Sequence, residues 1–134
     1  IGSDQPNAEL ITTAISRATV ALAVASRARA ILCSSESGRT ARIIARHRPR
    51  VPLLGITPFE ATARRMQLLW GVIPIVVTAF HSTDEMILKM VRAAKVGGHV
   101  QIGDNVVLTA GIPLEVHGVT NMVKVHTIRK ADLD

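Results

Sequence analysis

The sequence of 134 residues predicts an α/β fold, a three-layer α/β/α arrangement around a five-stranded, mostly parallel sheet with an antiparallel last strand. Three observations support this prediction. Short apolar, β-branched runs alternate with longer segments of helical spacing, as in parallel sheets that carry helices on both faces. No helical segment precedes the last β-branched run, so that strand returns antiparallel to its neighbour. One Trp, two Phe and no Tyr leave Ala, Val, Ile and Leu to form a closely packed interior.

The first element expected is a helix from about residue 8 to residue 26, in which apolar residues recur at three- and four-residue steps. Residues 1–7 lack this pattern and are interpreted as a tail or linker before one domain of residues 8–134. Three further helices are expected at about residues 38–47, 58–70 and 82–96. Thr57 and Ser82 are each followed three residues later by a glutamate, which predicts a capping box at the last two helices.

Five strands are expected at residues 30–33, 53–56, 72–77, 105–109 and 122–128. The last of these alternates apolar with polar residues, which is typical of an edge strand. Open α/β sheets bind ligands beyond the carboxyl ends of the strands, where the strand order reverses. If the first and fourth strands are neighbours at that reversal, the turn at residues 35–40 and the loop at 110–121 flank one crevice. This crevice is the predicted site.

The turn after the first strand has the composition of an anion-binding site. Three hydroxyl residues, a glycine and an arginine gather there: Ser35, Ser37, Gly38, Arg39 and Thr40. The first amides of a helix lack partners within the helix and lie at the positive end of its dipole, so a phosphate fits there. Thr40 stands where a capping box would place a glutamate, which leaves the amides open to a ligand. The alternative is that Ser37 is an ordinary helix N-cap.

The positive charge of the chain is concentrated in one stretch. The formal net charge is +6, and arginines occupy positions 39, 42, 46, 48 and 50. Nucleic-acid binding would explain such a cluster, but the stretch has no interleaved aromatic residues, no known binding motif and no basic tail. A solvated helix face beside a phosphate ligand is the favoured interpretation, so no nucleic-acid partner is expected.

Composition also bears on location and on chemistry. Cys33 is the single cysteine, which excludes an internal disulfide, suits a reducing compartment and predicts a buried thiol. The apolar runs are shorter than the roughly 20 residues that span a bilayer, so we expect a cytoplasmic protein without a membrane partner. Common catalytic motifs are missing and the five histidines are scattered, so no catalytic residue and no metal site are expected. Trp70, Met86 and Met90 are expected to be core residues.

Taken together, the motifs resemble the C-terminal domain of pyruvate kinase. The matching segments follow the family order over nearly the whole chain: residues 36–42 (ESGRTAR), 48–57 (RPRVPLLGIT), 69–74 (LWGVIP), 82–86 (STDEM), 103–113 (GDNVVLTAGIP) and 118–126 (GVTNMVKVH). The resemblance implies a five-stranded α/β domain of the glycolytic enzyme that transfers phosphate from phosphoenolpyruvate to ADP with Mg²⁺ and K⁺. The catalytic barrel that holds those ligands is not in this sequence, so the chain alone is expected to be inactive and to need no cofactor.

The resemblance further implies a phosphorylated allosteric effector and a role in a homo-oligomer, with the catalytic barrel of the parent chain as a partner. The family's phosphate loop matches Ser35, Ser37, Gly38, Arg39 and Thr40, and its effector loop matches Gly111, Ile112, Pro113, Gly118 and Thr120. Glu36 stands where members activated by fructose bisphosphate often carry a lysine, and residues 79–83 lack the Trp and Arg of the second phosphate site. A sugar monophosphate or AMP is therefore expected at least as readily as a bisphosphate.

Two alternatives remain beside this interpretation. One is a stand-alone phosphate-ligand-binding module of the same fold, and the other is a small phosphotransfer enzyme that uses the same pocket. A barrel encoded upstream of residue 1 in the source gene would separate the first interpretation from both alternatives.

Overall fold

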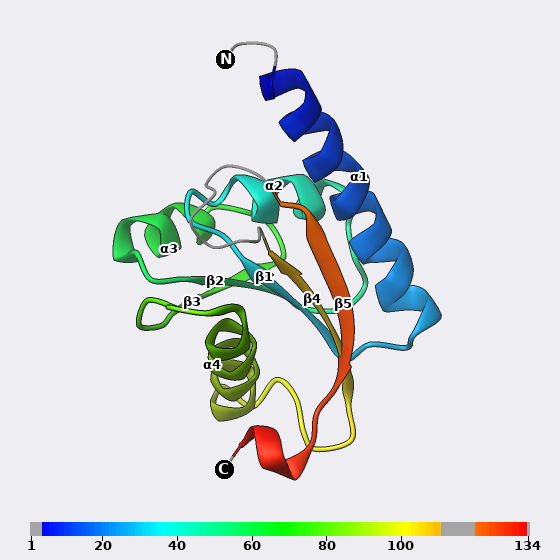
Figure 1. Cartoon of the computed structure of the whole chain (residues 1–134), viewed down its shortest axis with the longest axis vertical. Coiled ribbons are helices and arrows are strands. Elements are labelled where there is room, and N and C mark those ends of the chain that lie inside the picture. Colours follow the sequence, from blue (N-terminus) through cyan, green and yellow to red (C-terminus); the bar gives the residue numbers. More distant parts are fainter. Residues whose placement is uncertain (1–3, 111–119, 134) are drawn as a thin grey trace.

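The computed structural model describes residues 4–110 and 120–133 and has the predicted three-layer α/β architecture (Figure 1). A five-stranded sheet of order β3-β2-β1-β4-β5 forms the central layer. Its strands are β1 (Ala30–Ser34), β2 (Leu53–Thr57), β3 (Val72–Val76), β4 (Asn105–Ala110) and β5 (Met122–Thr127). The first four strands pair in parallel, and β5 is antiparallel to β4, which confirms the prediction.

Helices cover both faces of this sheet. They are α1 (Asp4–Ala25), α2 (Arg39–Arg46), α3 (Glu60–Met66) and α4 (Thr83–Val96), followed by a short 3₁₀ helix, η1 (Lys130–Asp132). Ala23, Ile44 and Met66 bring α1, α2 and α3 to one face, where they pack in a common cluster. Met86 and Met90 bring α4 to the other face. The sheet therefore separates two apolar cores.

The central strand β1 explains why its sequence is continuously apolar. Ile31 and Cys33 pack in the core beneath α1 and α2, whereas Leu32 packs in the core beneath α4, and all three are fully buried. A strand covered on both faces needs apolar residues at every position. Its neighbours are β2 and β4, so the strand order reverses beside β1, as expected for the predicted crevice.

Helix α1 begins at Asp4, so residues 4–7 belong to this helix and not to the tail that the sequence suggested. Pro6 is the third residue of the helix, where its missing N–H would have had no acceptor within the helix. The four residues contain no apolar side chain that could mark a buried helix face. Periodicity therefore could not detect this first turn.

Helix α1 also contains the one stretch within the described residues that is long and apolar enough to cross a membrane. Residues 7–25 have a mean hydropathy of 1.4, and 22% of the stretch is buried. Polar residues interrupt its apolar ones, so unbroken apolar runs in the sequence do not reveal this stretch. A helix that packs on a sheet can have the same composition, and α1 packs against α2, β1, β4 and β5.

Helix α3 is shorter than predicted, and its predicted capping box at Thr57 is wrong. Thr57 is the last residue of β2 and pairs with Val76 of β3, while Phe59 occupies the N-cap of α3. The Thr57 hydroxyl accepts a hydrogen bond from the Phe59 amide at 3.2 Å. Thr57 therefore belongs to the sheet through its pairing with β3 and is not the N-cap of α3 that the local pattern predicted.

The capping box predicted at Ser82 is confirmed in its serine half: Ser82 Oγ accepts a hydrogen bond from the Glu85 amide at 3.0 Å, whereas Oε1 of Glu85 pairs with Nζ of Lys89 at 2.8 Å. Met86 and Met90 are core residues, as predicted. The prediction for Trp70 is wrong, because 68% of this residue is exposed. The Arg48 guanidinium lies 4.4 Å from the centre of the Trp70 ring, in a cation–π contact.

Candidate phosphate-binding site

The predicted phosphate turn joins β1 to α2 at the carboxyl end of the central strand (Figure 1). Ser35 is buried, and its Oγ accepts the Gly38 amide at 2.9 Å. Ser37 Oγ accepts the Arg39 amide at 3.2 Å. A hydroxyl that accepts a hydrogen bond still has its own hydrogen to donate. Both serines can therefore shape the turn and donate to an anionic ligand at the same time.

Gly38, and not Ser37, occupies the N-cap of α2, so the simple N-cap interpretation of Ser37 is wrong. The φ angle of Gly38 is 87°, a left-handed conformation that favours glycine. A Cβ at this position would lie 3.2 Å from Cγ of Met66 on α3. Thr62, also on α3, donates its hydroxyl to the backbone oxygen of Glu36 at 2.6 Å. Helix α3 therefore fixes the shape of the turn.

Two backbone amides at the start of α2, those of Thr40 and Ala41, have no acceptor among the described residues. The neighbouring amides of Gly38 and Arg39 bind the two serines, and the Arg42 amide bonds to the Gly38 oxygen at 3.0 Å. The first turn of α2 contains no acidic residue to offset the positive end of the helix dipole. This end of α2 therefore favours a bound anion.

The Arg39 side chain contacts α1. Its Nη2 lies 2.9 Å from Oε1 of Glu9, and the two side chains are 44% and 64% exposed. An exposed ion pair of this kind contributes about 0.2–1 kcal/mol, so Arg39 can exchange Glu9 for a phosphate at low cost. Sequence reasoning missed this pair, because no local pattern connects residues that are 30 positions apart.

The two predicted halves of the crevice meet at a pair of threonines. The Oγ1 atoms of Thr40 and Thr120 lie 2.6 Å apart, although the residues are 80 positions apart in the sequence. Thr120 is buried, and its amide donates to Oγ1 of Thr12 on α1 at 3.2 Å. The contact to Thr12 is a further long-range contact that sequence reasoning missed. The other four predicted residues of this half, Gly111, Ile112, Pro113 and Gly118, lie outside the described residues.

A cavity of about 410 Å³ lies between α1 and α2, close to the phosphate turn. Its lining residues are Glu9 and Thr13 from α1 and Arg39, Arg42, Ile43, Arg46 and His47 from α2 and its C-cap. The arginine cluster was predictable from the sequence, whereas the cavity was not. The α1 side chains that complete it are remote in sequence.

The single cysteine takes no part in chemistry at this site. Cys33 is fully buried, as predicted, and burial raises the pKa of its thiol to about 12. The thiol stays protonated at neutral pH and is not a nucleophile. Within residues 4–110 and 120–133, no group of three or more His, Cys, Asp or Glu side chains is arranged to hold a metal ion.

The fold and the turn define a class of domain: an α/β sheet that presents hydroxyls, and helix amides without an acceptor among the described residues, where its strand order reverses. A family model described as pyruvate kinase, alpha/beta domain, matches residues 13–126. This chain belongs to the pyruvate kinase alpha/beta domain family, as the sequence resemblance indicated.

Individual relatives agree with this membership. The chain is 43% identical over 114 residues to the pyruvate kinase of Clostridium acetobutylicum, an alignment that covers 85% of the chain and 24% of the relative. It is 38% identical over 118 residues to that of Sporosarcina psychrophila, covering 88% and 20%. For Staphylococcus aureus the identity is 41% over 100 residues, covering 75% and 17%. The aligned part is thus about a quarter or less of each of these relatives.

Proposed function

We propose that this chain is the regulatory and assembly domain of a pyruvate kinase and binds a phosphorylated effector at the turn of residues 35–40. The observation that carries the proposal is the contact between Thr40 and Thr120. This contact joins both sides of the crevice beside the amides of Thr40 and Ala41. It lies beyond the carboxyl ends of the neighbouring strands β1 and β4. Ligands of open α/β sheets bind at such a point.

The phosphate would be held mainly by neutral donors. Its oxygens would accept hydrogen bonds from the amides of Thr40 and Ala41 and from the hydroxyls of Ser35 and Ser37. Arg39 would add a charge-assisted bond after leaving Glu9, and each such bond contributes about 1.5–3 kcal/mol. Because the Arg39 side chain is 44% exposed, this part of the affinity should fall as salt concentration rises.

A sugar monophosphate or AMP suits this turn at least as well as a bisphosphate. Among the residues proposed to contact the phosphate, Arg39 is the single cation, and the exposed Glu36 lies within the same turn. A second phosphate group would need further cationic partners to offset the loss of its hydration. A ligand with one phosphate makes no such demand.

In a full-length enzyme, this domain would serve a catalytic barrel that transfers phosphate from phosphoenolpyruvate to ADP in the cytoplasm. Mg²⁺ and K⁺ would act at that barrel, and we propose no metal ligand and no catalytic residue in this chain. The domain would contribute regulation: an effector bound at the turn would bias the position of α2 and of the segment around Thr120 relative to the rest of the enzyme.

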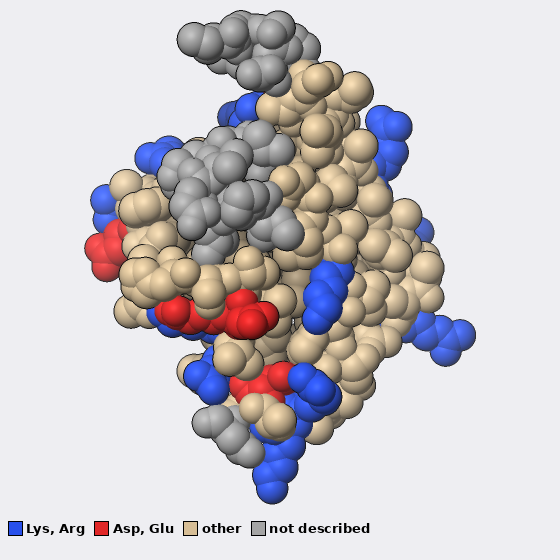
Figure 2. Space-filling model, in the orientation of Figure 1, with Lys and Arg blue, Asp and Glu red and all other residues tan. Residues whose placement is uncertain are grey.

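The outer surface of α1 and β5 fits a role in assembly. Leu10 and Val24 on α1 are 68% and 70% exposed, and Val125 on β5 is 39% exposed. Figure 2 shows that most of the surface on the α1 side is uncharged, with Lys and Arg side chains standing apart from one another. Exposed apolar surface of this kind marks contact with another protein or domain. We propose that a second copy or the barrel covers it.

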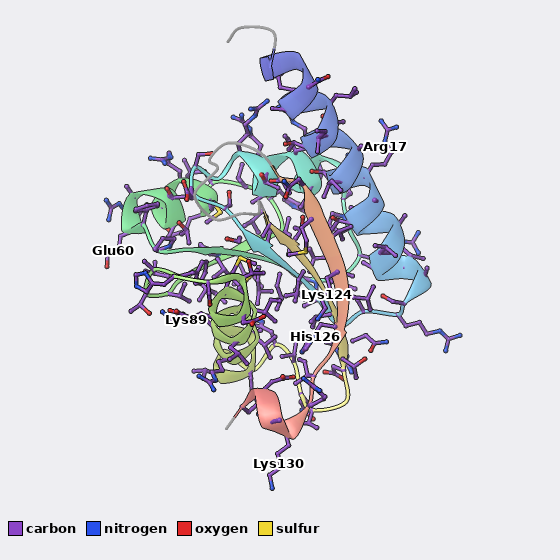
Figure 3. All side chains as sticks on the ribbon, viewed as in Figure 1. Arg17, Glu60, Lys89, Lys124, His126 and Lys130 are labelled. Carbon is purple, nitrogen blue, oxygen red and sulfur yellow. The ribbon has the colours of Figure 1, made fainter. Side chains whose placement is uncertain are left out.

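Calorimetric titration of the whole chain with a sugar monophosphate, a sugar bisphosphate and AMP tests effector binding. Thr40→Ala removes one hydroxyl of the crevice, and Thr127→Ala removes an exposed threonine hydroxyl at the far end of β5 as its control. Arg39→Ala removes the cation, and Arg17→Ala is its control because Arg17 points away from the molecule on α1 (Figure 3). We expect both site variants to weaken binding by about tenfold or more and both controls to leave it unchanged.

Two results would contradict the proposal. The first is a lack of binding by all three ligands at millimolar concentration. The second is binding that survives both Thr40→Ala and Arg39→Ala, since the turn would then contribute nothing to the ligand site.

A further inference from the structure

Helix α2 concentrates positive charge on one side. Arg39, Arg42 and Arg46 stand three and four residues apart, a spacing that places them on one face of the helix. The helix, Arg39–Arg46, contains no acidic residue. Like charges at this spacing destabilise a helix by a few tenths of a kcal/mol per pair. The arrangement therefore carries a small cost that a bound anion would remove.

Two of these arginines have no acidic partner within the described parts of the chain. Arg39 pairs with Glu9, whereas neither Arg42 nor Arg46 lies within 4.0 Å of a carboxylate oxygen among the described side chains, those of residues 7–110 and 120–133. Both side chains are exposed and line the cavity between α1 and α2. They supply two guanidinium groups with several N–H donors each, the geometry that binds phosphate or carboxylate in a bidentate manner.

The cavity is suited to a small ligand. Its volume of about 410 Å³ lies in the range of small-molecule sites, which is about 300–1,000 Å³. Ile43 gives it an apolar contact, and Thr13 and His47 add polar groups. With three arginines and one glutamate, the lining has a formal charge of +2 when His47 is neutral. No Phe, Tyr or Trp among the described residues lines the cavity, so it lacks the large aromatic side chains on which nucleic-acid bases usually stack.

We propose that this cavity is a second anion site, which binds a small metabolite with one or more phosphate groups through Arg42 and Arg46. This cavity is distinct from the phosphate turn. The Thr40 hydroxyl of the turn contacts the Thr120 hydroxyl, and Thr40 does not line the cavity. Arg39 lies between the two sites, because it follows the turn directly and also lines the cavity. The two sites share this one residue.

Inorganic pyrophosphate is a suitable probe, because it has the charge of a phosphorylated metabolite without a sugar or base. Its affinity for the whole chain is measured by calorimetry at low and moderate salt. The Arg42→Ala/Arg46→Ala variant removes the two proposed ligands. The Arg17→Ala/Arg64→Ala variant removes the same charge from exposed positions that do not line the cavity. Far-UV circular dichroism confirms that each variant is folded.

We expect the cavity variant to bind pyrophosphate about tenfold or more weakly and the charge-matched control to stay within about twofold of the wild type. Thr40→Ala, which alters only the phosphate turn, is expected to leave a second, Arg42-dependent binding event in place. The outcomes at the two sites can therefore be separated. If only the cavity binds an anion in the wild type, the proposed function is overturned. If only the turn binds an anion in the wild type, this inference is overturned.

Three results would overturn the second site. Equally weakened binding of pyrophosphate in the control variant would show that its affinity depends only on the net charge of the protein. Complete loss of binding in Thr40→Ala would show that the turn is the sole anion site. Tighter binding of a DNA or RNA oligonucleotide than of pyrophosphate, lost in the cavity variant, would assign these arginines to nucleic acid instead.

Discussion

Replacement of Asp132 by alanine tests how strongly the C-terminal 3₁₀ helix is held to the sheet. The Asp132 carboxylate is 2.9 Å from Nε2 of His126 on β5 and accepts the Arg129 amide at 2.8 Å. Figure 3 shows His126 on the strand just before the C-terminal turn. His126 and Asp132 are both buried, with 8% and 4% exposure. Their contact therefore lies out of water.

The magnitude follows from the bonds that are lost. A hydrogen bond to a charged group contributes about 1.5–3 kcal/mol. The variant loses these two and a longer one of 3.4 Å from Nη2 of Arg129, and it leaves the buried Nε2 of His126 unpaired. Since a fraying 3₁₀ helix would let water reach His126, we expect the free energy of unfolding to fall by roughly 2–4 kcal/mol. Lys130→Ala, an exposed change in the same helix, should stay within about 0.5 kcal/mol. Urea unfolding followed by circular dichroism measures both.

Acid should weaken the same contact. Burial raises the pKa of the Asp132 carboxyl. Hydrogen bonds from Arg129 and His126, and the charges of these residues, together lower the pKa by more than burial raises it, so it lies below the ordinary 3.8. The unfolded chain then takes up the proton at a higher pH than the folded chain. The contribution is full above about pH 4 and is lost as the pH falls through the folded pKa. A wild-type advantage over Asp132→Ala that is below 1 kcal/mol at neutral pH, or that grows in acid, would refute this reasoning.

Four further predictions concern the turn, the ion pair and the whole chain. Gly38→Ala should lower the free energy of unfolding by about 1–2 kcal/mol. The loss should exceed that of Gly103→Ala, because Gly103 has a similar φ of 93° but open space around it. Equal losses in the two variants would show that the close approach of residue 38 to Met66 has no energetic effect. Glu9→Gln should tighten sugar monophosphate binding up to about fivefold by releasing Arg39, an effect absent when Arg39 is also replaced by alanine. The purified chain should show no pyruvate kinase turnover, and activity that survives removal of contaminating enzyme would contradict this. Light scattering should detect self-association that Leu10→Asp/Val24→Asp reduces, whereas a strictly monomeric mass at high concentration would count against the exposed α1 surface as an interface.

The strands were predictable because their environment leaves a local trace. The run around Leu32 is buried on both faces of the sheet, so it is apolar at every position and stands out in the sequence. The antiparallel β5 followed from the absence of a helical segment before it. Helix α4 was predicted well because Ser82 caps it locally and because Met86 and Met90 repeat at helical spacing.

Features that depend on distant parts of the chain were missed. Thr57 looked like a helix cap, but its backbone pairs in the sheet with Val76. Trp70 looked like a core residue, but no layer of the described structure covers it. At the site, the residue types were predictable from the turn alone, whereas the partners Glu9 and Thr62 come from helices that only the tertiary fold brings close. A local sequence pattern identifies the hydrogen-bond donors of the turn more readily than the distant residues that hold those donors in place.

The most direct test of the central claim observes the two open amides themselves. In ¹⁵N-labelled protein, titration with a sugar monophosphate should shift the Thr40 and Ala41 amide signals in a saturable manner, because phosphate oxygens would become their acceptors. The amides of β3, at the far edge of the sheet, serve as the internal reference. The predicted result is a saturable shift at the amides of residues 40 and 41 that needs about tenfold or more ligand in Thr40→Ala than in the wild type. Binding that leaves both amide signals unmoved would contradict a phosphate site at the start of α2.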